Sequence, residues 1–508
     1  MELKVFRDIL CAGGGCCAAK AEIPVETEIL ISDYLPQVFK VVKCFVRPVV
    51  LQKQLQPGRL TLEGYVRCTV YYQGEDGAGL CQAEQKLPFH KVLELPDFPF
   101  TAWSTVVEGQ TEYINCRAVT PRRIEVRGAY GLTASVCTQC STEVITALSG
   151  CGIQQRPVTL RGVRQAAALD KLFAADGTVA FAGSPAAVLD ISGSAAVTEL
   201  KLLAGKAVAK GEIRAQCAWK EAESAALRSQ EAVIPFNQIL DVEGLTEDCR
   251  CLCAVEPVGF TLAEGENGGE ARLTATAQLH LRAWRPFALN CVADAFSTAC
   301  EVQCETAPLT TEQLACTLDE TAAVTCSGPL PDENTRLLAC FASFGPVGID
   351  RAGSVPALTA RVEVTAFGEN SLGEIDSYEK TAELVLPLPD CPAAGEVWPV
   401  CWLSAERVEA GCTGGSLEVT VTVRAAGAVL GRESLPCLSS VETGEPLAPA
   451  DPDISLRVYY AQPGEALFDI ARRFHVSPGR MREANALDAG TETLAAACRL
   501  LVPGAPGN

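Results

Sequence analysis

Histidine is the side chain that most often carries protons in enzymes, and this sequence of 508 residues contains only three, His90, His280 and His475. His90 follows a Pro-Phe pair, and His280 lies in a stretch that alternates like a strand. His475 ends a stretch with helical periodicity, where a cation suits the helix dipole. No serine or cysteine stands in a recognisable nucleophile pattern with any of them. We therefore expect all three to be structural, and we expect the protein not to be an enzyme.

Cysteine is abundant, with 25 residues, and some of them stand at spacings that metal or redox sites use. These are Cys137 and Cys140, with two residues between them; Cys249, Cys251 and Cys253, which alternate along one face of a strand-like run; and Cys300 and Cys304, which could lie one turn apart on a helix. None of these groups has a second pair at the spacing that a structural zinc site needs. A phosphate-binding glycine loop of the P-loop type is also missing from the sequence. The sequence thus indicates no metal and no cofactor.

The surroundings of the cysteines predict their redox state. Cys44, Cys68, Cys116 and Cys217 sit inside β-like runs, and a thiol in such a place behaves as a small buried hydrophobe. The domains expected below are too large to need a disulfide framework, and no targeting segment is visible. We expect reduced thiols in the core. The alternative is later oxidative cross-linking, which a protein of a large assembly would use.

The balance of charge and hydropathy narrows the classes of partner. The formal net charge is -20, which argues against nucleic acid and anionic membranes, because both are bound through Lys and Arg. A basic protein partner remains compatible with it. No run of eighteen apolar residues predicts a transmembrane segment. The N-terminus lacks the long apolar stretch of a signal peptide, so we expect a cytosolic protein.

Internal repeats organise most of the chain. Gly64, inside a strand-like run, is followed 24 residues later by Pro88 and a phenylalanine. Gly211 is followed at the same interval by Pro235 and a phenylalanine, and the two copies lie 147 residues apart, measured from Gly64 to Gly211. Repetition at a fixed interval indicates a repeated structural unit.

A third copy is weaker. Ala360 lies 149 residues after Gly211, and Pro387 follows it in a similar apolar run. On this alignment the third copy has lost both the glycine and the phenylalanine after the proline. Within each copy the apolar residues alternate, as in Leu417, Val419 and Val421, which is typical of strands with one buried face. The periodicity does not decide whether residues 137–182 and 291–329 hold a helix or an extra hairpin.

These patterns predict a mainly β protein of three tandem β-sandwich-like units and a small α+β module. The domains are expected at residues 1–150, 151–298 and 299–445, followed by a Pro-rich linker at 446–453 and a C-terminal module at 454–508. In that module a β-prone run precedes Pro463-Gly464, and Leu467, Ile470 and Phe474 follow at helical spacing. Ser477-Pro478 predicts the N-cap of a second helix, and residues 499–502 read as a closing strand. The order is β-α-α-β.

The C-terminal module resembles a LysM domain, and the sequences that carry the likeness are residues 463–471, 476–477, 485–487 and 502–503. With the three β units ahead of it, the chain resembles the SPOCS/LysM spore morphogenesis proteins of endospore-forming clostridia. The resemblance implies a role in spore coat or envelope morphogenesis, in the mother-cell cytoplasm at the forespore surface. It further implies that the LysM domain docks the coat-basement protein SpoIVA through a protein–protein interaction, while the SPOCS repeats act as an assembly platform.

The LysM resemblance also places a binding groove between two turns. The groove residues it implies are Gly464, Glu465, Ala466, Leu467, Phe468, Asn485, Ala486, Leu487 and Asp488. The family has Asp followed by Thr or Ser after the glycine, whereas Glu465 and Ala466 stand here, so a hydroxyl that N-acetyl-sugar recognition uses is missing. This weakens glycan binding and leaves protein binding possible. The alternative function is a cell-wall protein that binds peptidoglycan or chitin-type glycan, which would need export.

Overall fold

A computed structural model describes the chain at residues 2–75, 79–181, 185–221, 227–264, 270–392, 395–448 and 456–503. Strands make up most of these residues, and the two helices found among them are both in the C-terminal module. The prediction of a mainly β protein is confirmed. None of the described helices is long and apolar enough to span a membrane.

The strands up to Pro446 fall into three successive groups, called units 1, 2 and 3. Unit 1 consists of β1 (Lys4–Leu30), β2 (Val38–Gln56), β3 (Arg59–Gly74), β4 (Gly79–Glu94), β5 (Ala102–Thr120) and β6 (Arg123–Ser149). Unit 2 consists of β7 (Ile153–Ala180), β8 (Pro185–Leu203), β9 (Lys206–Glu221), β10 (Leu227–Asp241), β11 (Arg250–Glu264) and β12 (Glu270–Ser297). Unit 3 consists of β13 (Cys300–Pro329), β14 (Arg336–Phe344), β15 (Gly348–Asp350), β16 (Ala357–Glu369), β17 (Ile375–Pro387), β18 (Val397–Thr413) and β19 (Ser416–Pro446). Most of the expected linker lies outside the described residues.

Each unit closes around one core, with a sheet on either side. In unit 1 the sheets β1-β6-β5 and β2-β3-β4 face each other across a single apolar cluster. Unit 2 places β8-β9-β10 against β7-β12-β11, and unit 3 places β14–β17 against β13-β19-β18. The predicted alternation supplies these cores, since Leu417, Val419 and Val421 are buried while Glu418 between them is exposed.

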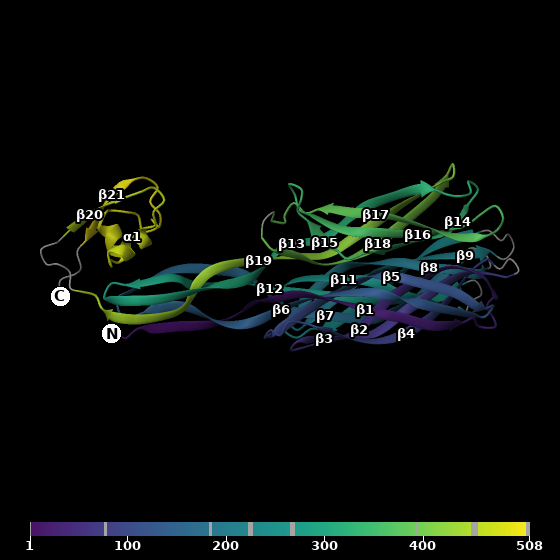
Figure 1. Ribbon diagram of the computed structural model, residues 1–508, viewed down its shortest axis with the longest axis horizontal. Helices are drawn as coiled ribbons and strands as arrows, with labels where there is room; N and C mark the ends of the chain where they lie inside the picture. The colour runs from purple at the N-terminus through teal and green to yellow at the C-terminus, as the bar shows by residue number, and fades with distance from the viewer. Residues whose placement is uncertain are drawn as a thin grey trace.

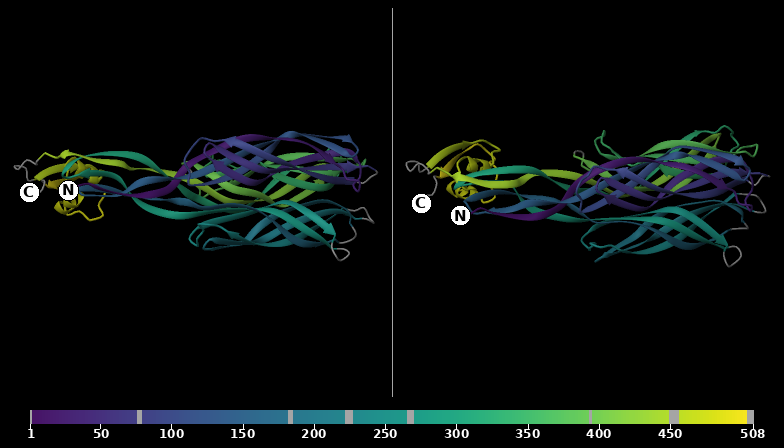
Figure 2. Two further views of the ribbon diagram at one scale, coloured as in Figure 1. Left: turned by 90° about the horizontal axis from the view of Figure 1, so that it is seen from below. Right: turned by 60° about the horizontal axis from the view of Figure 1, so that its bottom comes forward.

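Six long strands extend beyond the three bodies and form a shared stem (Figures 1 and 2). They are β1, β6, β7, β12, β13 and β19, of 27 to 31 residues each. The stem is held by two apolar clusters, around Leu160 and Val292, that draw on all three of its antiparallel strand pairs, β1 with β6, β7 with β12 and β13 with β19. Residues 137–182 and 291–329, which the periodicity left open, belong mostly to these strands. Cys300 and Cys304 therefore lie in a strand, and the helical spacing expected for them is wrong.

The cross-strand register corrects the alignment of the third copy. Gly64 faces Phe89 across β3 and β4, and Gly211 faces Phe236 across β9 and β10. Each glycine is the sixth residue of its strand, and in β16 the sixth residue is Val362, which faces Ala382. Ala360 instead corresponds to Leu62 and Ala209, which share its buried position. Unit 3 thus has a Val–Ala pair, Val362 with Ala382, where units 1 and 2 have a Gly–Phe pair.

The reason for the glycine lies in the neighbouring strand. A Cβ on Gly64 would meet the carbonyl oxygen of Val49 at 2.0 Å, and one on Gly211 would meet that of Ala196 at 2.1 Å. In both units the register of this neighbouring strand shifts beside the contact. Unit 3 breaks the equivalent strand into β14 and β15, so its backbone leaves room for Val362.

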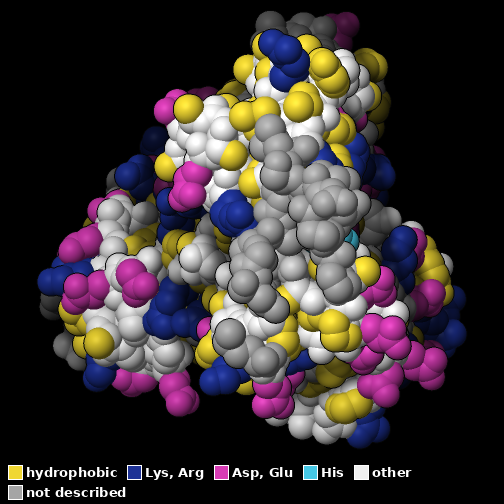
Figure 3. Space-filling model, turned by 90° about the vertical axis from the view of Figure 1, so that its left-hand side faces the viewer, with side chains coloured by type: hydrophobic (Ala, Val, Ile, Leu, Met, Phe, Trp, Pro, Cys, Tyr) yellow, Lys and Arg dark blue, Asp and Glu magenta, His cyan; other side chains and the backbone are white. Residues whose placement is uncertain are grey.

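The three units also pack against one another. Seen from the end that carries the C-terminal module, acidic side chains gather on the lower part of the surface, with basic ones among them (Figure 3). Units 1 and 3 meet through an aromatic cluster. Phe45 lies 5.3 Å from Phe341, and Tyr71 lies 5.0 Å from Phe367, measured between ring centroids. Lys40 pairs with Asp376 beside this cluster at 2.5 Å. The units therefore form one body and not a flexible string.

Candidate functional site

The C-terminal module has the order β-α-α-β that its sequence predicts. It consists of β20 (Leu456–Ala461), α1 (Leu467–Arg473), α2 (Pro478–Ala484) and β21 (Cys498–Pro503). Ser477 caps α2 by accepting a hydrogen bond from the N–H of Arg480 at 3.2 Å, and a proline opens the helix, as expected. Leu467, Ile470, Ala471 and Met481 are buried in the small core between the helices and the strands.

The first expected groove segment is bound within the module. The N–H of Gly464, which has a φ of 87°, donates to the carbonyl of Leu494 at 2.8 Å. The N–H of Leu467 donates to Glu492 at 2.8 Å, and Ala466 forms a bridge with Thr493. The backbone amides of Gly464 and Leu467 therefore bind another part of the module. The side chain of Leu467 is fully buried and belongs to the core.

Glu465 closes its own turn. One carboxylate oxygen accepts the hydroxyl proton of Tyr459 at 2.8 Å, and the other accepts the N–H of Gln462 at 2.8 Å. These bonds, the Gln462 N–H first among them, lower the pKa of the Glu465 carboxyl below its ordinary value. Arg473 lies 3.6 Å away and adds its charge. Both oxygens of the carboxylate thus stabilise the turn through hydrogen bonds within the module.

The second expected groove segment, residues 485–488, is only partly available to a ligand. Asn485 donates to the carbonyls of Met481 and Leu501, each at 2.8 Å, and accepts the N–H of Leu501 at 2.6 Å, so it fastens β21 to α2. Ala486, with a φ of 51°, and Asp488 are exposed, while Leu487 is half-buried. The hydrogen bonds thus join the two expected segments to different parts of the module, 464–467 to 492–494 and Asn485 to β21.

Phe468, which was also expected in the groove, faces the stem. Its ring lies 5.1 Å from that of Phe296 in β12, edge to face, and the guanidinium of Arg156 in β7 sits 4.5 Å from its centroid. Phe296 is itself buried among the core residues of the module. Phe468 therefore holds the module against unit 2 and is not an open contact.

Ion pairs and one histidine complete this docking face, which we define as Arg156, Asp294, Ala295, Phe296 and Ser297 of the stem. Arg472 binds both carboxylate oxygens of Asp294, at 2.7 and 2.8 Å, and donates to the carbonyl of Ala295 at 3.2 Å. Asp469 pairs with Arg156. The ring nitrogen Nδ1 of His475 lies 3.0 Å from the carbonyl oxygen of Ser297. Sequence reasoning missed this face, because its stem residues are far away in the chain and follow no motif.

The open face of the module is the outer side of its small sheet. Val458, Tyr460 and Leu501 are 52%, 67% and 38% exposed. Val458 and Leu501 face each other across β20 and β21, and Arg499 stands opposite Tyr460. These four residues, called the outer face, combine apolar surface with a cation. Such a composition suits a protein partner better than a bare polar surface does.

A buried charge cluster lies where the three units meet. Asp170 of β7 accepts hydrogen bonds from Lys53 at 2.6 Å and from Arg282 at 2.9 Å, and it lies 2.8 Å from Nδ1 of His280. Although burial alone would raise the pKa of Asp170, His280 and the two cations hold it below its ordinary value. Trp402 of unit 3 stacks on His280 at 4.6 Å. The histidine–aspartate pair thus belongs to an ionic joint between units.

The same joint includes Glu256 of β11. Burial would raise the pKa of its carboxyl, but Arg47 and His280 outweigh burial and lower the pKa to about 2. Arg47 comes from unit 1, so the charges alternate across the boundary between units 1 and 2. Among the described residues, no group of three or more His, Cys, Asp and Glu side chains is arranged to hold a metal ion.

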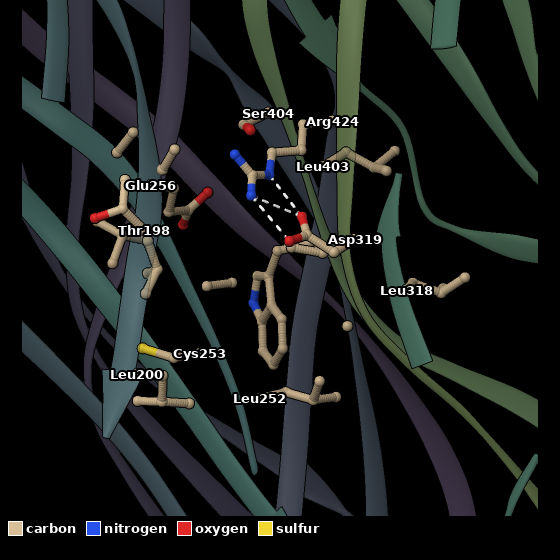
Figure 4. Close-up of a pocket in the computed structure, with 18 of the residues that line it drawn as sticks. Thr198, Leu200, Leu252, Cys253, Glu256, Leu318, Asp319, Leu403, Ser404 and Arg424 are labelled. Atoms are coloured by element: carbon tan, nitrogen blue, oxygen red, sulfur yellow. Dashed lines mark hydrogen bonds and ion pairs between the residues drawn. The ribbon is translucent and has the colours of Figure 1, made fainter. Parts of the chain in front are cut away.

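A cavity of about 200 Å³ lies beside this joint, between units 2 and 3 (Figure 4). Its one prominent cation is Arg424, which donates to both carboxylate oxygens of Asp319, at 2.8 and 3.0 Å. A third bond reaches Glu406 at 3.2 Å. Since two carboxylates already neutralise the guanidinium, the cavity offers no unbound cation for an anionic ligand. It is part of the boundary between the units.

Comparison with protein families bears on units 1 and 2. Residues 37–119 and 186–261 match the family model described as SipL, SPOCS domain. These two segments are similar to SPOCS domains. The SPOCS matches run from β2 into β5 and from β8 into β11, so they leave out the long stem strands. They confirm the resemblance drawn from the repeats. No curated protein and no solved structure matches the chain.

Proposed function

We propose that the chain is a non-enzymatic spore morphogenesis protein. Its three units serve as SPOCS assembly domains, and its C-terminal module is a LysM domain that docks a coat-basement protein of the SpoIVA kind. The single observation that carries this proposal is the match of two segments to the SipL, SPOCS domain model, because that family is associated with sporulation. Docking would take place in the mother cell, at the forespore surface.

The shape of the molecule supports a docking role for the module. The stem holds the module at one end of the long axis, away from the three bodies (Figure 1). The docking face fixes its orientation through Phe468, Arg472 and His475. A partner bound to the outer face would therefore be held at a defined distance and angle from the SPOCS units, which is what an assembly platform needs.

The groove residues argue for a protein partner and against glycan. Leu467 is buried, Phe468 lies on the stem, and the carboxylate of Glu465 is bound within its turn. A sugar would find few polar groups there that are not already paired. The outer face, with Tyr460 next to Arg499, provides the aromatic and cationic side chains that protein interfaces favour.

Binding measurements on the full chain test the proposal. We expect purified SpoIVA to bind the full chain, and we expect the double variant Val458→Ala/Tyr460→Ala to bind at least about tenfold more weakly. Phe39→Ala is the matched control, because Phe39 is an apolar side chain 62% exposed on unit 1. Chitooligosaccharides and peptidoglycan fragments form the second arm. Glycan binding together with no affinity for SpoIVA would refute the proposal.

A further inference from the structure

Two thiols face each other across the strand pair β1 and β6 of the stem. Cys16 of β1 stands directly opposite Cys137 of β6, and their sulfur atoms are 2.7 Å apart. A covalent S–S bond is about 2.05 Å long, so the two atoms need to approach by only about 0.7 Å. All 25 cysteines lie in the described part of the chain, and none of them is in a disulfide.

Three further pairs of thiols lie near each other in the fold. They are Cys44 with Cys116, Cys291 with Cys437, and Cys316 with Cys391. The members of each pair also share an apolar cluster, so packing holds them together. Eight of the 25 thiols are thus already placed next to a partner, although each partner is far away in the chain.

The pairs join different parts of the architecture. Cys44 in β2 and Cys116 in β5 connect the two facing sheets of unit 1. In unit 3, Cys316 of β13 is paired with Cys391, which lies in the connection between β17 and β18. Cys291 in β12 and Cys437 in β19 connect unit 2 to unit 3 within the stem. Linking all four pairs would fasten the two sheets of unit 1, fix one connection of unit 3 to β13 and join units 2 and 3 to each other.

We propose that these four pairs are intramolecular disulfide-forming sites, oxidised by a small disulfide such as oxidised glutathione. The thiolate of one cysteine attacks the oxidant, forms a mixed disulfide and releases one glutathione thiolate. The partner thiolate then attacks the protein sulfur and releases the second glutathione. The protein loses two electrons and two protons per pair, and these reduce the oxidant to two glutathione thiols. This inference does not rest on the proposed function.

Burial sets the expected order of reaction. Cys16 and Cys137 are both half-buried, whereas Cys291 and Cys437 are both buried. Burial raises the pKa of the Cys291 thiol to about 11, so little thiolate is present at neutral pH. In the first unit, the hydrogen bond from Cys44 lowers the pKa of Cys116, which makes Cys116 the attacking thiolate. We expect the Cys291–Cys437 disulfide to form last, because both of its thiols are buried.

The test treats the folded, reduced full chain with oxidised glutathione and counts free thiols over time. We expect a loss of eight of the 25 thiols, and we expect non-reducing peptide mapping by mass spectrometry to find the four linked peptide pairs. The melting temperature should rise on oxidation and fall back on reduction with dithiothreitol. A thiol count that does not change, or links that are mainly intermolecular or scrambled, would overturn the proposal.

Two variants sharpen the test. Cys137→Ser should remove the Cys16–Cys137 peptide pair, lower the loss to six thiols and leave the other three pairs in place. Cys498→Ser is the matched control, because Cys498 lies in β21 of the C-terminal module, outside all four pairs. It should leave the loss of eight thiols unchanged. A change of pairing in the control variant would likewise contradict the assignment.

Discussion

Arg472 of α1 donates hydrogen bonds to both carboxylate oxygens of Asp294 in β12, at 2.7 and 2.8 Å, although the two residues are 178 positions apart in the sequence. The pair ties the C-terminal module to the stem and sets the direction in which the outer face points. Both side chains keep some contact with solvent, 42% for Arg472 and 20% for Asp294, so this pair is an orienting contact more than a large source of stability.

Replacing Asp294 should therefore loosen the module without unfolding it. In Asp294→Ala we expect residues 456–503 to tumble faster than the three units, because the docking face then loses the ion pair that binds Arg472 at two oxygens. NMR relaxation measures this difference directly. Arg473→Ala is the control, since Arg473 contacts Tyr459 and Glu465 within the module. Equal tumbling of module and stem in Asp294→Ala would contradict the assigned role of the pair.

The contribution of the joint between the units to the free energy of unfolding should depend strongly on Asp170. Asp170→Ala leaves Lys53, Arg282 and His280 without their shared carboxylate, and removing one partner of a buried ion pair costs about 3–5 kcal/mol. Denaturant unfolding should show a loss of that size. Asp176→Ala in the same strand is the control, because its exposed pair with Arg272 should contribute at most about 1 kcal/mol. Similar losses in the two variants would show that the joint does not hold the units.

Glu108 should make stability depend on pH. Its carboxylate accepts the N–H of Val347 from unit 3, and burial raises its pKa from 4.5 to about 7. The folded chain thus binds more protons than the unfolded chain between these values, so the contribution of Glu108 to stability is lost as pH rises through this window.

The variant Glu108→Gln removes this dependence and keeps an acceptor for Val347. Relative to the native chain, it should gain nothing below about pH 4 and about 1–3 kcal/mol above pH 7. Unfolding in urea at a series of pH values measures the difference, and groups that both chains share cancel. A stability difference that stays constant from pH 4 to pH 8 would show that Glu108 has an ordinary pKa.

Gly211 should be intolerant of a side chain. A Cβ there would lie 2.1 Å from the backbone oxygen of Ala196, which cannot move as a flexible side chain does, so Gly211→Ala should cost about 1–3 kcal/mol. The same Cβ would lie 2.6 Å from the ring of Phe236, but truncating Phe236 should not rescue the variant, because the backbone clash remains. Gly411→Ala in β18 is the control, since a Cβ there meets nothing within 4 Å. Thermal unfolding of the three variants separates these outcomes, and rescue by the Phe236 truncation would refute the backbone explanation.

The candidate site shows where sequence reasoning stops. The turn at Gly464 and the cap at Ser477 were predictable, because both depend on neighbouring residues. The role of Phe468 was not, because its partners Arg156 and Phe296 come from strands of unit 2. For the same reason the sequence predicted only that His280 lies in a strand, and it did not predict the contact of His280 with Asp170 at the centre of the joint.

The sequence by itself determined the mainly β class, the strands with alternating faces and the order of elements in the C-terminal module. These follow from local periodicity and from capping and turn residues, which act over a few positions. Only the tertiary structure decided the shared stem, the joint around Asp170, the thiol pairs and the docking of α1 on β12. Each of these features brings together side chains 72 to 178 residues apart, or from different units. The hydrophobic pattern of a strand indicates that one of its faces is buried, but it does not indicate which other strand or unit covers that face.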